Sequence, residues 1–350
     1  MNPAPLKGRG TATNPVNRFQ ILEVEYDPAD PDDERPSPRT KFYKDLSESL
    51  ITMNDSPDIG FSAGLNAYRG CEHGCAYCYA RPFHEYLGFS SGLDFETKIM
   101  VKTDAPAILR RELAAKKWQP QCIMMSGVTD CYQPAEKIFK LTRGCLEVLL
   151  EFRNPVGIVT KNHLITRDID LLTELARFQC ISANVSITSL KPELSRVLEP
   201  RAAMPEHRLD AVRQLSAAGI PVGVMVAPII PGLTDIEVPA ILNAAAAAGA
   251  RRAHYTVVRL PYAVKDIFTN WLETHFPEKK NKVLGMIQDV RGGKLYDAKW
   301  GERMRGTGAY AEQIGELFRV ARHRAGLDRD STELSIDHFR RPGGVQLELL

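Results

Sequence analysis

Six short apolar runs alternate with segments of helical periodicity between residues 64 and 260, and this alternation limits what the chain can fold into. The runs span residues 64–68, 122–126, 156–160, 181–187, 222–228 and 253–258. Most are rich in Val, Ile and Met, as expected for parallel strands that are buried on both faces. Repeated strand–helix units predict a parallel α/β fold. Six units are too few for the usual closed barrel, so we expect a partial (β/α)6 barrel of the TIM type with its active face at the carboxyl ends of the strands.

The segments between the runs carry helix signals. Helices are predicted over residues 104–118, 134–152, 166–175, 205–219 and 239–249. Pro in the first turn and Gly after the last turn are typical of helix ends. The helix that begins at Pro134 has one apolar face, which consists of Ile138, Leu141, Cys145, Val148, Leu149 and Phe152.

The two ends of the chain differ from the alternating region. Residues 1–55 are rich in Pro and polar side chains, which predicts an irregular N-terminal extension with one short strand over residues 19–26. Residues 56–262 form the predicted core barrel. Residues 263–350 have a mainly helical pattern broken by glycines, so we expect a helical C-terminal extension that covers one edge or mouth of the barrel.

Composition and charge exclude several classes of protein. The 350 residues are 44% apolar and 25% charged, with a net charge of +2, which argues against a broad electrostatic grip on nucleic acid. No apolar leader follows Met1, and the longest apolar run, residues 222–233, is shorter than the roughly 20 residues that span a bilayer. The seven cysteines do not form the pattern of a secreted disulfide framework. We expect a cytoplasmic protein with metal or thiol chemistry and no membrane partner.

Three cysteines directly after the first predicted strand, Cys71, Cys75 and Cys78, give the strongest chemical signal. Three thiolates on one short loop can converge on one metal centre. A cubane iron–sulfur cluster takes four protein ligands as a rule, so three ligands leave one iron open to bind and activate another molecule. The alternative is a structural zinc site with His73 or a distant residue as fourth ligand. Zinc sites usually pair one C-x-x-C unit with a second pair of ligands, and the sequence has no such second pair.

The spacing C-x-x-x-C-x-aromatic-C after the first strand of a six-unit barrel resembles the radical S-adenosylmethionine (SAM) superfamily. The resemblance implies that Cys71, Cys75 and Cys78 hold a [4Fe–4S] cluster whose fourth iron binds the amino and carboxylate groups of SAM. It further implies one-electron cleavage of SAM to a 5′-deoxyadenosyl radical that abstracts hydrogen from a substrate, with a reducing partner such as flavodoxin or ferredoxin. The longer string over residues 66–82 resembles a narrower group, the bacterial radical SAM proteins related to spore photoproduct lyase and often labelled DNA repair photolyases.

The same resemblance assigns residues at the later strand ends to SAM. They are Ser126, Gly127 and Thr129 near the amino group, Lys161 and Ser186 near the carboxylate and ribose, and Ile230 in the segment that packs on adenine. Each of these short motifs is weak alone, because Gly, Pro, Ser and Thr end strands in many folds. The assignment depends on all of these motifs following the cysteine loop along the chain in the expected order.

Tyr77, Tyr79 and Cys131 are the candidate catalytic residues. The Tyr-Cys-Tyr string around the third cysteine is similar to that of spore photoproduct lyase, in which both tyrosines are implicated in radical transfer. That lyase also uses a cysteine near the end of the second strand to return a hydrogen atom to its substrate radical. The donor position of the lyase falls near Gly127 in this sequence, and the candidate donor here is Cys131, which follows Asp130 at the predicted active face.

The remaining cysteines and the C-terminal arginines have simpler interpretations. Buried, inert thiols are expected at Cys122, Cys145 and Cys180 rather than a second cluster. A phosphate-tracking patch could be formed by the basic residues near the C-terminus, which are Arg319, Arg322, Arg324, Arg340 and Arg341, although acidic neighbours dilute it.

Three functions are compatible with these patterns. The first is an enzyme like spore photoproduct lyase that acts on a nucleic acid or another macromolecule. The second is a radical SAM enzyme that modifies RNA or a small molecule. The third is a non-catalytic, zinc-binding nucleic-acid module, which reductive cleavage of SAM would exclude.

Overall fold

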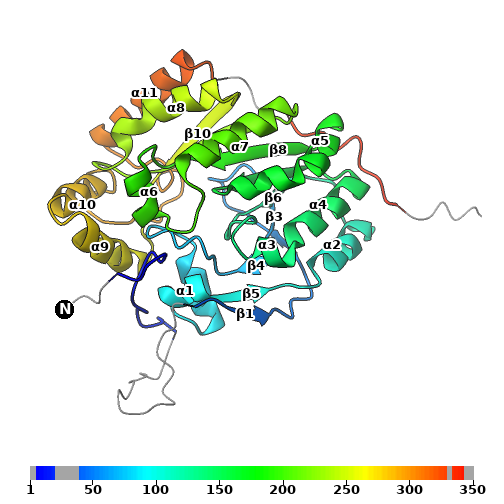
Figure 1. Ribbon diagram of the computed structural model, residues 1–350, viewed down its shortest axis with the longest axis horizontal. Coiled ribbons are helices and arrows are strands. Elements are labelled where there is room, and N and C mark those ends of the chain that lie inside the picture. The colour runs from blue at the N-terminus through cyan, green and yellow to red at the C-terminus, as the bar shows by residue number, and fades with distance from the viewer. Residues whose placement is uncertain (1–4, 20–38, 329–332, 343–350) are drawn as a thin grey trace, which may run out of the picture.

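The structure is a computed structural model that describes residues 5–19, 39–328 and 333–342. Its centre is a seven-stranded sheet in the order β10-β9-β8-β7-β6-β3-β2 (Figure 1). The strands are β2 (Ile51–Met53), β3 (Ala63–Leu65), β6 (Ile123–Met125), β7 (Val156–Thr160), β8 (Ile181–Ser186), β9 (Val222–Ile229) and β10 (Arg252–Val257). All neighbouring pairs are parallel except β2 on β3, which is antiparallel. The predicted partial (β/α)6 barrel is confirmed.

Helices surround the outer side of this sheet (Figure 1). They are α2 (Ala105–Ala114), α3 (Glu136–Phe139), α4 (Leu141–Phe152), η2 (His163–Asp168), α5 (Ile169–Arg177), α6 (Pro192–Leu198), α7 (Pro205–Ala217), η3 (Asp235–Glu237) and α8 (Val238–Ala247). The apolar faces of α2, α4, α5, α7 and α8 and the strands form one core in which side chains such as Leu149, Leu172, Val212 and Ile241 are fully buried. The buried side chains of α6 belong to a second apolar cluster, which includes Cys75 and Tyr77. This packing fixes the strand ends, where the functional side chains follow.

A second, three-stranded sheet has the order β1-β5-β4. It consists of β1 (Lys41–Lys44), β4 (Tyr68–Arg69) and β5 (Lys98–Val101), and η1 (Arg81–Leu87) and α1 (Leu93–Thr97) lie between β4 and β5. The sequence pattern did not predict β1, β2 or β5. Strands β1 and β2 are short and have mostly exposed side chains, so apolar alternation does not mark them. The strand predicted over residues 19–26 lies outside the described residues except for Phe19, which is in a turn.

The first predicted strand, residues 64–68, is wrong in its second half. The barrel strand β3 ends at Leu65, and Tyr68 begins β4 in the other sheet. Between them, the side-chain oxygen of Asn66 accepts hydrogen bonds from the backbone N–H groups of Val128 and Thr129, at 3.1 and 3.2 Å. The chain therefore leaves the sheet after Leu65, and the Asn66 side chain holds the loop that follows β6. The other five predicted strands agree with the structure to within one residue at each end.

The helix predicted over residues 134–152 is two helices, α3 and α4, separated by Lys140. Lys140 has a left-handed backbone with φ of +53°, which ends the hydrogen-bond ladder of α3. The helical periodicity is broken at this residue, so Ile138 in α3 does not share the face of Leu141 and Cys145 in α4. Ile138 is 65% exposed, which corrects its predicted place on the buried face. The rest of that face is buried as predicted. The helix predicted over residues 104–118 ends at Ala114, because Ala115 is extended.

The C-terminal extension is mainly helical, with α9 (Val264–His275), α10 (Lys280–Asp289) and α11 (Ala309–Arg324). Buried side chains of α9 and α10, among them Phe268 and Ile287, share an apolar cluster with Cys75 and Tyr77 of the cysteine loop. The extension therefore packs against the loop that carries the strongest chemical signal. Within the described ranges, no helix is both long enough and apolar enough to cross a membrane.

Candidate active site

The cysteine loop runs from β4 to η1 and is held by backbone hydrogen bonds to two other elements. The N–H of Cys71 donates to the carbonyl of Phe95 in α1, at 2.9 Å, and the N–H of Ala76 donates to the carbonyl of Leu198 in α6, at 3.0 Å. Cys71 and Cys75 are buried and Cys78 is partly buried, and all three are free thiols. The loop is thus a fixed part of the fold that presents three thiols together.

Arg81 anchors this loop from the inside. Its guanidinium donates from Nε and Nη2 to the carbonyl oxygen of Cys75, at 3.0 and 2.9 Å. The same guanidinium forms an ion pair with Glu96 at 2.6 Å, and neither side chain has any exposed surface. Sequence reasoning missed this pair, although Arg81 lies in the string over residues 66–82 that carried the resemblance. Periodicity gives no signal for Glu96, because it lies in a five-residue helix.

An N-terminal strap, residues 5–19, crosses the outside of the cysteine loop. The N–H of Gly10 donates to Oε2 of Glu96 at 3.0 Å, so one carboxylate holds both the strap and Arg81. A Cβ atom on Gly10 would lie 1.7 Å from the carbonyl oxygen of Gly74, which only glycine avoids. Farther along, the carbonyl of Thr13 accepts from the N–H of Leu93 at 3.0 Å. The composition of this segment predicted an irregular chain, and these contacts show that the chain packs closely on the folded body.

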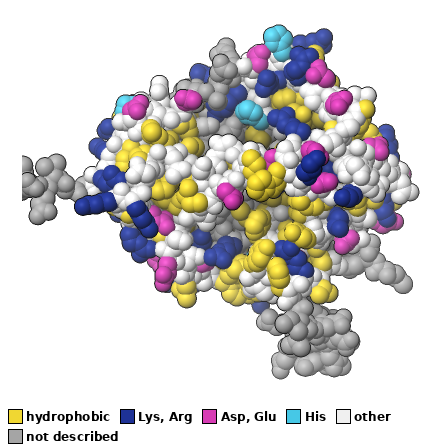
Figure 2. Space-filling model, turned by 180° about the vertical axis from the view of Figure 1, so that it is seen from behind, with side chains coloured by type: hydrophobic (Ala, Val, Ile, Leu, Met, Phe, Trp, Pro, Cys, Tyr) yellow, Lys and Arg dark blue, Asp and Glu magenta, His cyan; other side chains and the backbone are white. Residues whose placement is uncertain are grey.

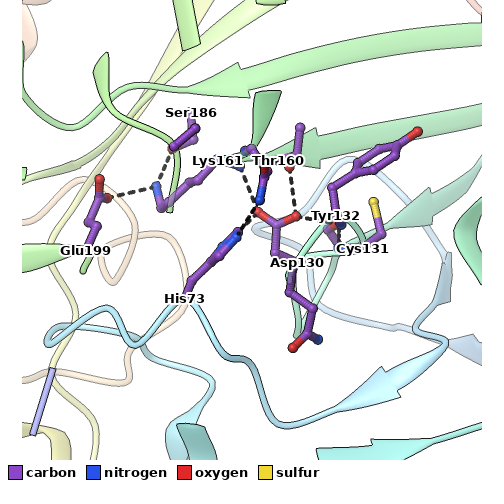
Figure 3. A network of polar contacts seen from close by, with 12 residues as sticks. His73, Asp130, Cys131, Tyr132, Thr160, Lys161, Ser186 and Glu199 are labelled. Atoms are coloured by element: carbon purple, nitrogen blue, oxygen red, sulfur yellow. Dashed lines mark hydrogen bonds and ion pairs between the residues drawn. The ribbon is translucent and has the colours of Figure 1, made fainter. Parts of the chain in front are cut away.

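Asp130 lies at the centre of a polar network beside the cysteine loop (Figure 3). Its carboxylate accepts from the Thr160 hydroxyl and from the backbone N–H of Lys161, both at 2.7 Å, and faces Nδ1 of His73 at 3.4 Å. Burial would raise the pKa of Asp130, but His73 and these hydrogen bonds outweigh burial and lower it. On its other side, His73 Nε2 lies 3.2 Å from the Asn162 amide. The ionised Asp130 therefore ties the ends of β6 and β7 to the middle of the cysteine loop.

Lys161 and Ser186, two predicted SAM ligands, lie in direct contact. Lys161 Nζ donates to Oγ of Ser186 at 2.5 Å and to the carbonyl oxygen of Ala227 at 2.9 Å. The Ser186 hydroxyl also donates to that carbonyl, at 2.9 Å, and Oγ1 of Thr188 lies 3.1 Å from it. The ends of β7, β8 and β9 thus converge on one cation at the active face of the barrel.

Glu199 lies behind Lys161 and is fully buried. Its carboxylate is 3.4 Å from Lys161 Nζ, pairs with the guanidinium of Arg208 and accepts from the hydroxyls of Tyr77 and Thr188. Burial would raise the pKa of Glu199, but the Arg208 and Lys161 charges and these hydrogen bonds lower it far below its usual value. Nothing in the sequence around Glu199 indicates that two cations and two hydroxyls surround its carboxylate.

The two candidate tyrosines occupy different environments. Tyr77 is 6% exposed, and its hydroxyl donates to Glu199. Tyr79 is 39% exposed, and its hydroxyl donates to the carbonyl oxygen of Gly127 at 2.7 Å. Tyr77 therefore points into the protein, whereas Tyr79 lies at the open edge beside one of the predicted SAM residues.

The loop after β6 carries the other predicted SAM residues of that strand. Ser126 has a left-handed backbone with φ of +72°, and its hydroxyl accepts from the N–H of Cys131 at 2.9 Å. Thr129 is buried, and its hydroxyl donates to the carbonyl oxygen of Tyr68 at 3.0 Å. Ile230, after β9, is fully buried in the apolar cluster that includes Cys75 and Tyr77. The structure thus brings Gly127 to Tyr79 and Ile230 to the cysteine loop.

Cys131 and the remaining cysteines belong to the core of the barrel. Cys131, Cys145 and Cys180 are buried in one apolar cluster, and Cys180 directly precedes β8. In Figure 3 the Cys131 sulfur projects away from Asp130, on the side opposite to Lys161 and Glu199. Cys122 is half-buried just before β6. Within the described ranges, no three His, Cys, Asp or Glu side chains are arranged to hold a single metal ion.

The arginines of the predicted basic patch near the C-terminus form separate contacts with nearby residues. Arg319 pairs with Glu316 on the exposed face of α11 at 2.7 Å. Arg340 donates to the carbonyl oxygen of Glu151 at 2.8 Å, and Arg341 to that of Trp118 at 2.9 Å. Arg340 thus binds the last turn of α4, and Arg341 binds the chain after α2.

The profile of the radical SAM superfamily matches residues 65–245, which include the cysteine loop and all the predicted SAM residues. The chain belongs to the radical SAM superfamily. It is 37% identical to an uncharacterized protein of Mycobacterium tuberculosis over 240 residues, which cover 68% of this chain and 71% of that protein. It is 24% identical to a radical SAM Nalpha-GlyT isomerase of Pseudomonas phage M6, with 73% of this chain and 52% of that protein covered.

Among solved structures of radical SAM enzymes, spore photoproduct lyase complexed with dinucleoside spore photoproduct has a similar fold. The TM-score is 0.59 at 15% identity, and the superposition covers 81% of this chain and 79% of that chain. At this identity the likeness shows the fold alone.

Members of the radical SAM superfamily use a [4Fe–4S] cluster and SAM, and the donor set of this chain fits them. Burial raises the pKa of Cys71, Cys75 and Cys78, and the charges of Asp130 and of the neighbouring thiols raise that of Cys71 further. Buried thiols that disfavour one another's ionised form need a positive centre in order to become ligands. Three such thiols on one loop therefore suit a cluster that keeps one iron for another ligand.

Proposed function

We propose that this radical SAM enzyme cleaves SAM reductively and abstracts hydrogen from a nucleic-acid substrate, as an enzyme like spore photoproduct lyase. The observation that carries the proposal is the link from Tyr77, between Cys75 and Cys78, through Glu199 to Lys161 at the strand ends. When bound, the cluster would supply the electron that cleaves the sulfonium of SAM to the 5′-deoxyadenosyl radical.

The side chains of this proposal have distinct roles. Cys71, Cys75 and Cys78 would hold the cluster. The SAM carboxylate and ribose would be bound by Lys161 and Ser186, whose contact fixes both groups in one place. The amino group would be bound in the loop that contains Ser126, Gly127 and Thr129, and adenine would pack on Ile230.

The exposure and orientation of each side chain indicate which residues would face the substrate. Tyr79 would face substrate, because it is the exposed member of the tyrosine pair. Tyr77 would position Glu199 and the cysteine loop. Cys131 is the candidate hydrogen donor, and its side chain would have to turn toward the active face, because it is buried in the apolar core and its sulfur projects away from Asp130 (Figure 3).

A nucleic-acid substrate is supported by the fold that this chain shares with the lyase bound to a dinucleoside spore photoproduct. The second candidate, a radical SAM enzyme that modifies RNA or a small molecule, keeps the same site and changes only the substrate. Flavodoxin or ferredoxin is the proposed reductant.

The first experiment is anaerobic purification with iron, sulfide and zinc analysis, followed by dithionite, SAM and assay for 5′-deoxyadenosine. We expect about four irons per chain and 5′-deoxyadenosine. The Cys71→Ala/Cys75→Ala/Cys78→Ala variant should lose both, whereas Cys145→Ala, a buried cysteine in α4, should keep both. One zinc per chain without cleavage of SAM would overturn the proposal in favour of a zinc module.

Substrate class is tested by adding ultraviolet-irradiated DNA or tRNA to the active enzyme. Hydrogen transfer from deuterated substrate to 5′-deoxyadenosine identifies the class that reacts. Transfer from tRNA alone would favour the second candidate.

A further inference from the structure

Four exposed aromatic side chains gather around one arginine at the edge of the active face. The guanidinium of Arg18 lies 3.8 Å from the ring centroid of Tyr262, 4.7 Å from that of Phe19 and 5.4 Å from that of Tyr86. The ring centroids of Phe19 and Tyr86 are 5.0 Å apart, and those of Phe83 and Tyr86 are 6.5 Å apart. Each of the four rings is at least half exposed.

This group continues to the predicted SAM site through two contacts of Tyr79 and one short loop. Tyr79 bonds to Gly127 at the end of β6, and the guanidinium of Arg259 lies 4.3 Å from the Tyr79 ring. Arg259 and Tyr262 belong to the same loop after β10. We call the whole set the aromatic–arginine surface, and it consists of Arg18, Phe19, Tyr79, Phe83, Tyr86, Arg259 and Tyr262.

Four segments build this surface: the strap, the cysteine loop, η1 and the loop after β10. Figure 2 shows hydrophobic side chains interleaved with Lys and Arg on one face of the molecule. Single exposed apolar side chains are ordinary, but a contiguous exposed group marks an interaction site. Tyr262 has a left-handed backbone with φ of +51°, a cost that a core-packing role does not explain because its side chain is 56% exposed.

We propose that the aromatic–arginine surface binds unpaired bases of a DNA strand next to the active site. Rings stack on any base because every base has a π face, and guanidinium groups stack on bases and contact phosphates. The proposal rests on the proposed function for its choice of DNA, since that choice follows from a nucleic-acid substrate.

The charges on this surface favour stacking on bases over non-specific electrostatic binding of phosphates. Arg18 is paired with Glu85 at 2.5 Å, so its charge is partly neutralised while its planar face remains against the rings. Arg259 lies nearer the active site, over Tyr79. A duplex hides its base faces and offers mainly phosphates, so this surface should prefer single strands.

The test is fluorescence anisotropy of a labelled 12-nucleotide oligothymidine, a 12-base-pair duplex and a 12-nucleotide oligouridine on the cluster-loaded enzyme without reductant. We expect the single DNA strand to bind more tightly than the duplex. The variants Tyr86→Leu and Phe83→Leu/Tyr86→Leu keep apolar bulk but remove rings, and each lost stacking contact should weaken binding about tenfold.

The matched control is Trp300→Leu, which removes an exposed ring that lies 5.8 Å from the guanidinium of Arg303 in the C-terminal extension. It should leave binding unchanged. Cleavage of SAM without substrate should be equal in wild type and Phe83→Leu/Tyr86→Leu, which separates failure of the surface from failure of the proposed function. Equal loss of binding in Trp300→Leu, wild-type affinity in Phe83→Leu/Tyr86→Leu, preference for duplex, or tighter binding of oligouridine would each overturn the proposal.

Discussion

The ammonium group of Lys161 lies 3.4 Å from the carboxylate of Glu199, at the point where the strand ends meet the cysteine loop. Arg208 pairs with the same carboxylate from the other side. Two cations and one anion thus share a buried site, and removal of the anion would leave both cations without their partner. Glu199 therefore holds Lys161 and Tyr77 in place without itself facing the open edge.

The variant Glu199→Gln should lower the free energy of unfolding by about 3–5 kcal/mol, as expected when one member of a buried ion pair is removed. Urea unfolding of the wild type and the variant measures the difference. The control is Asp210→Asn, which removes a half-exposed pair with His163 and should cost less than about 1 kcal/mol. Equal stability of Glu199→Gln and wild type would show that the network does not support the site.

The variants Tyr77→Phe and Tyr79→Phe should behave differently. Tyr77→Phe removes a buried donor to Glu199 and should cost about 1–2 kcal/mol of stability. Tyr79→Phe removes an exposed hydroxyl and should change stability by less than about 0.5 kcal/mol, but it should lower the yield of product per SAM cleaved. Urea unfolding measures the stability of both variants, and the ratio of product to 5′-deoxyadenosine measures the yield of Tyr79→Phe. A normal ratio in Tyr79→Phe would remove it from the substrate side.

The variant Lys161→Met should weaken binding of SAM about 10- to 100-fold, because a hydrogen bond to a charged group contributes about 1.5–3 kcal/mol. Equilibrium binding of SAM to the cluster-loaded enzyme measures the loss. Lys191→Met, which removes an exposed cation 3.9 Å from Glu237, serves as the control and should bind SAM like wild type. Unchanged affinity in Lys161→Met would mean that Lys161 only neutralises Glu199.

The barrel could be predicted from sequence because its signals are local. The run over residues 156–160 matches β7 at both ends, and it is buried except for Val159. Its apolar side chains need no knowledge of their neighbours to predict a buried strand. Lys161 and Ser186 were named by the resemblance to the radical SAM superfamily rather than by periodicity, and the structure places their side chains in contact at the ends of β7 and β8.

The parts that sequence reasoning missed depend on contacts between distant residues. Glu96 binds Arg81 and also Gly10, 86 residues away, and neither spacing nor composition encodes such a contact. Ile138 was misplaced because a single left-handed residue, Lys140, interrupts the helix without a Gly or Pro to signal it. Chemistry-bearing motifs were thus visible in the sequence, whereas the groups that hold them in place were not.

The variant Gly10→Ala should loosen the N-terminal strap, because the added Cβ would meet the Gly74 carbonyl at 1.7 Å. Stability should fall by about 1–3 kcal/mol, the usual cost of overpacking, and iron should be lost faster to a chelator. Gly60→Ala is the control, since its Cβ has no neighbour within 4 Å. Equal rates of iron loss in Gly10→Ala and wild type would show that the strap does not protect the loop.

His84 should make the protein less stable in weak acid. It is buried between Phe89 and Phe95, and burial lowers its pKa to about 4, whereas the unfolded chain has a value of about 6.5. Below pH 6.5 the unfolded state therefore binds a proton that the folded state does not, and stability falls as pH falls toward 4. The expected loss from this residue between pH 8 and pH 5 is about 2 kcal/mol.

The variant His84→Phe keeps a ring between the two phenylalanines but cannot bind the proton, so it should flatten this part of the pH dependence. Urea unfolding at pH 8 and pH 5 compares it with wild type and with His207→Gln, which removes an exposed histidine and should retain the wild-type slope. If His84→Phe loses as much stability as wild type between these values, then His84 is protonated in the folded protein and its burial does not control the acid response.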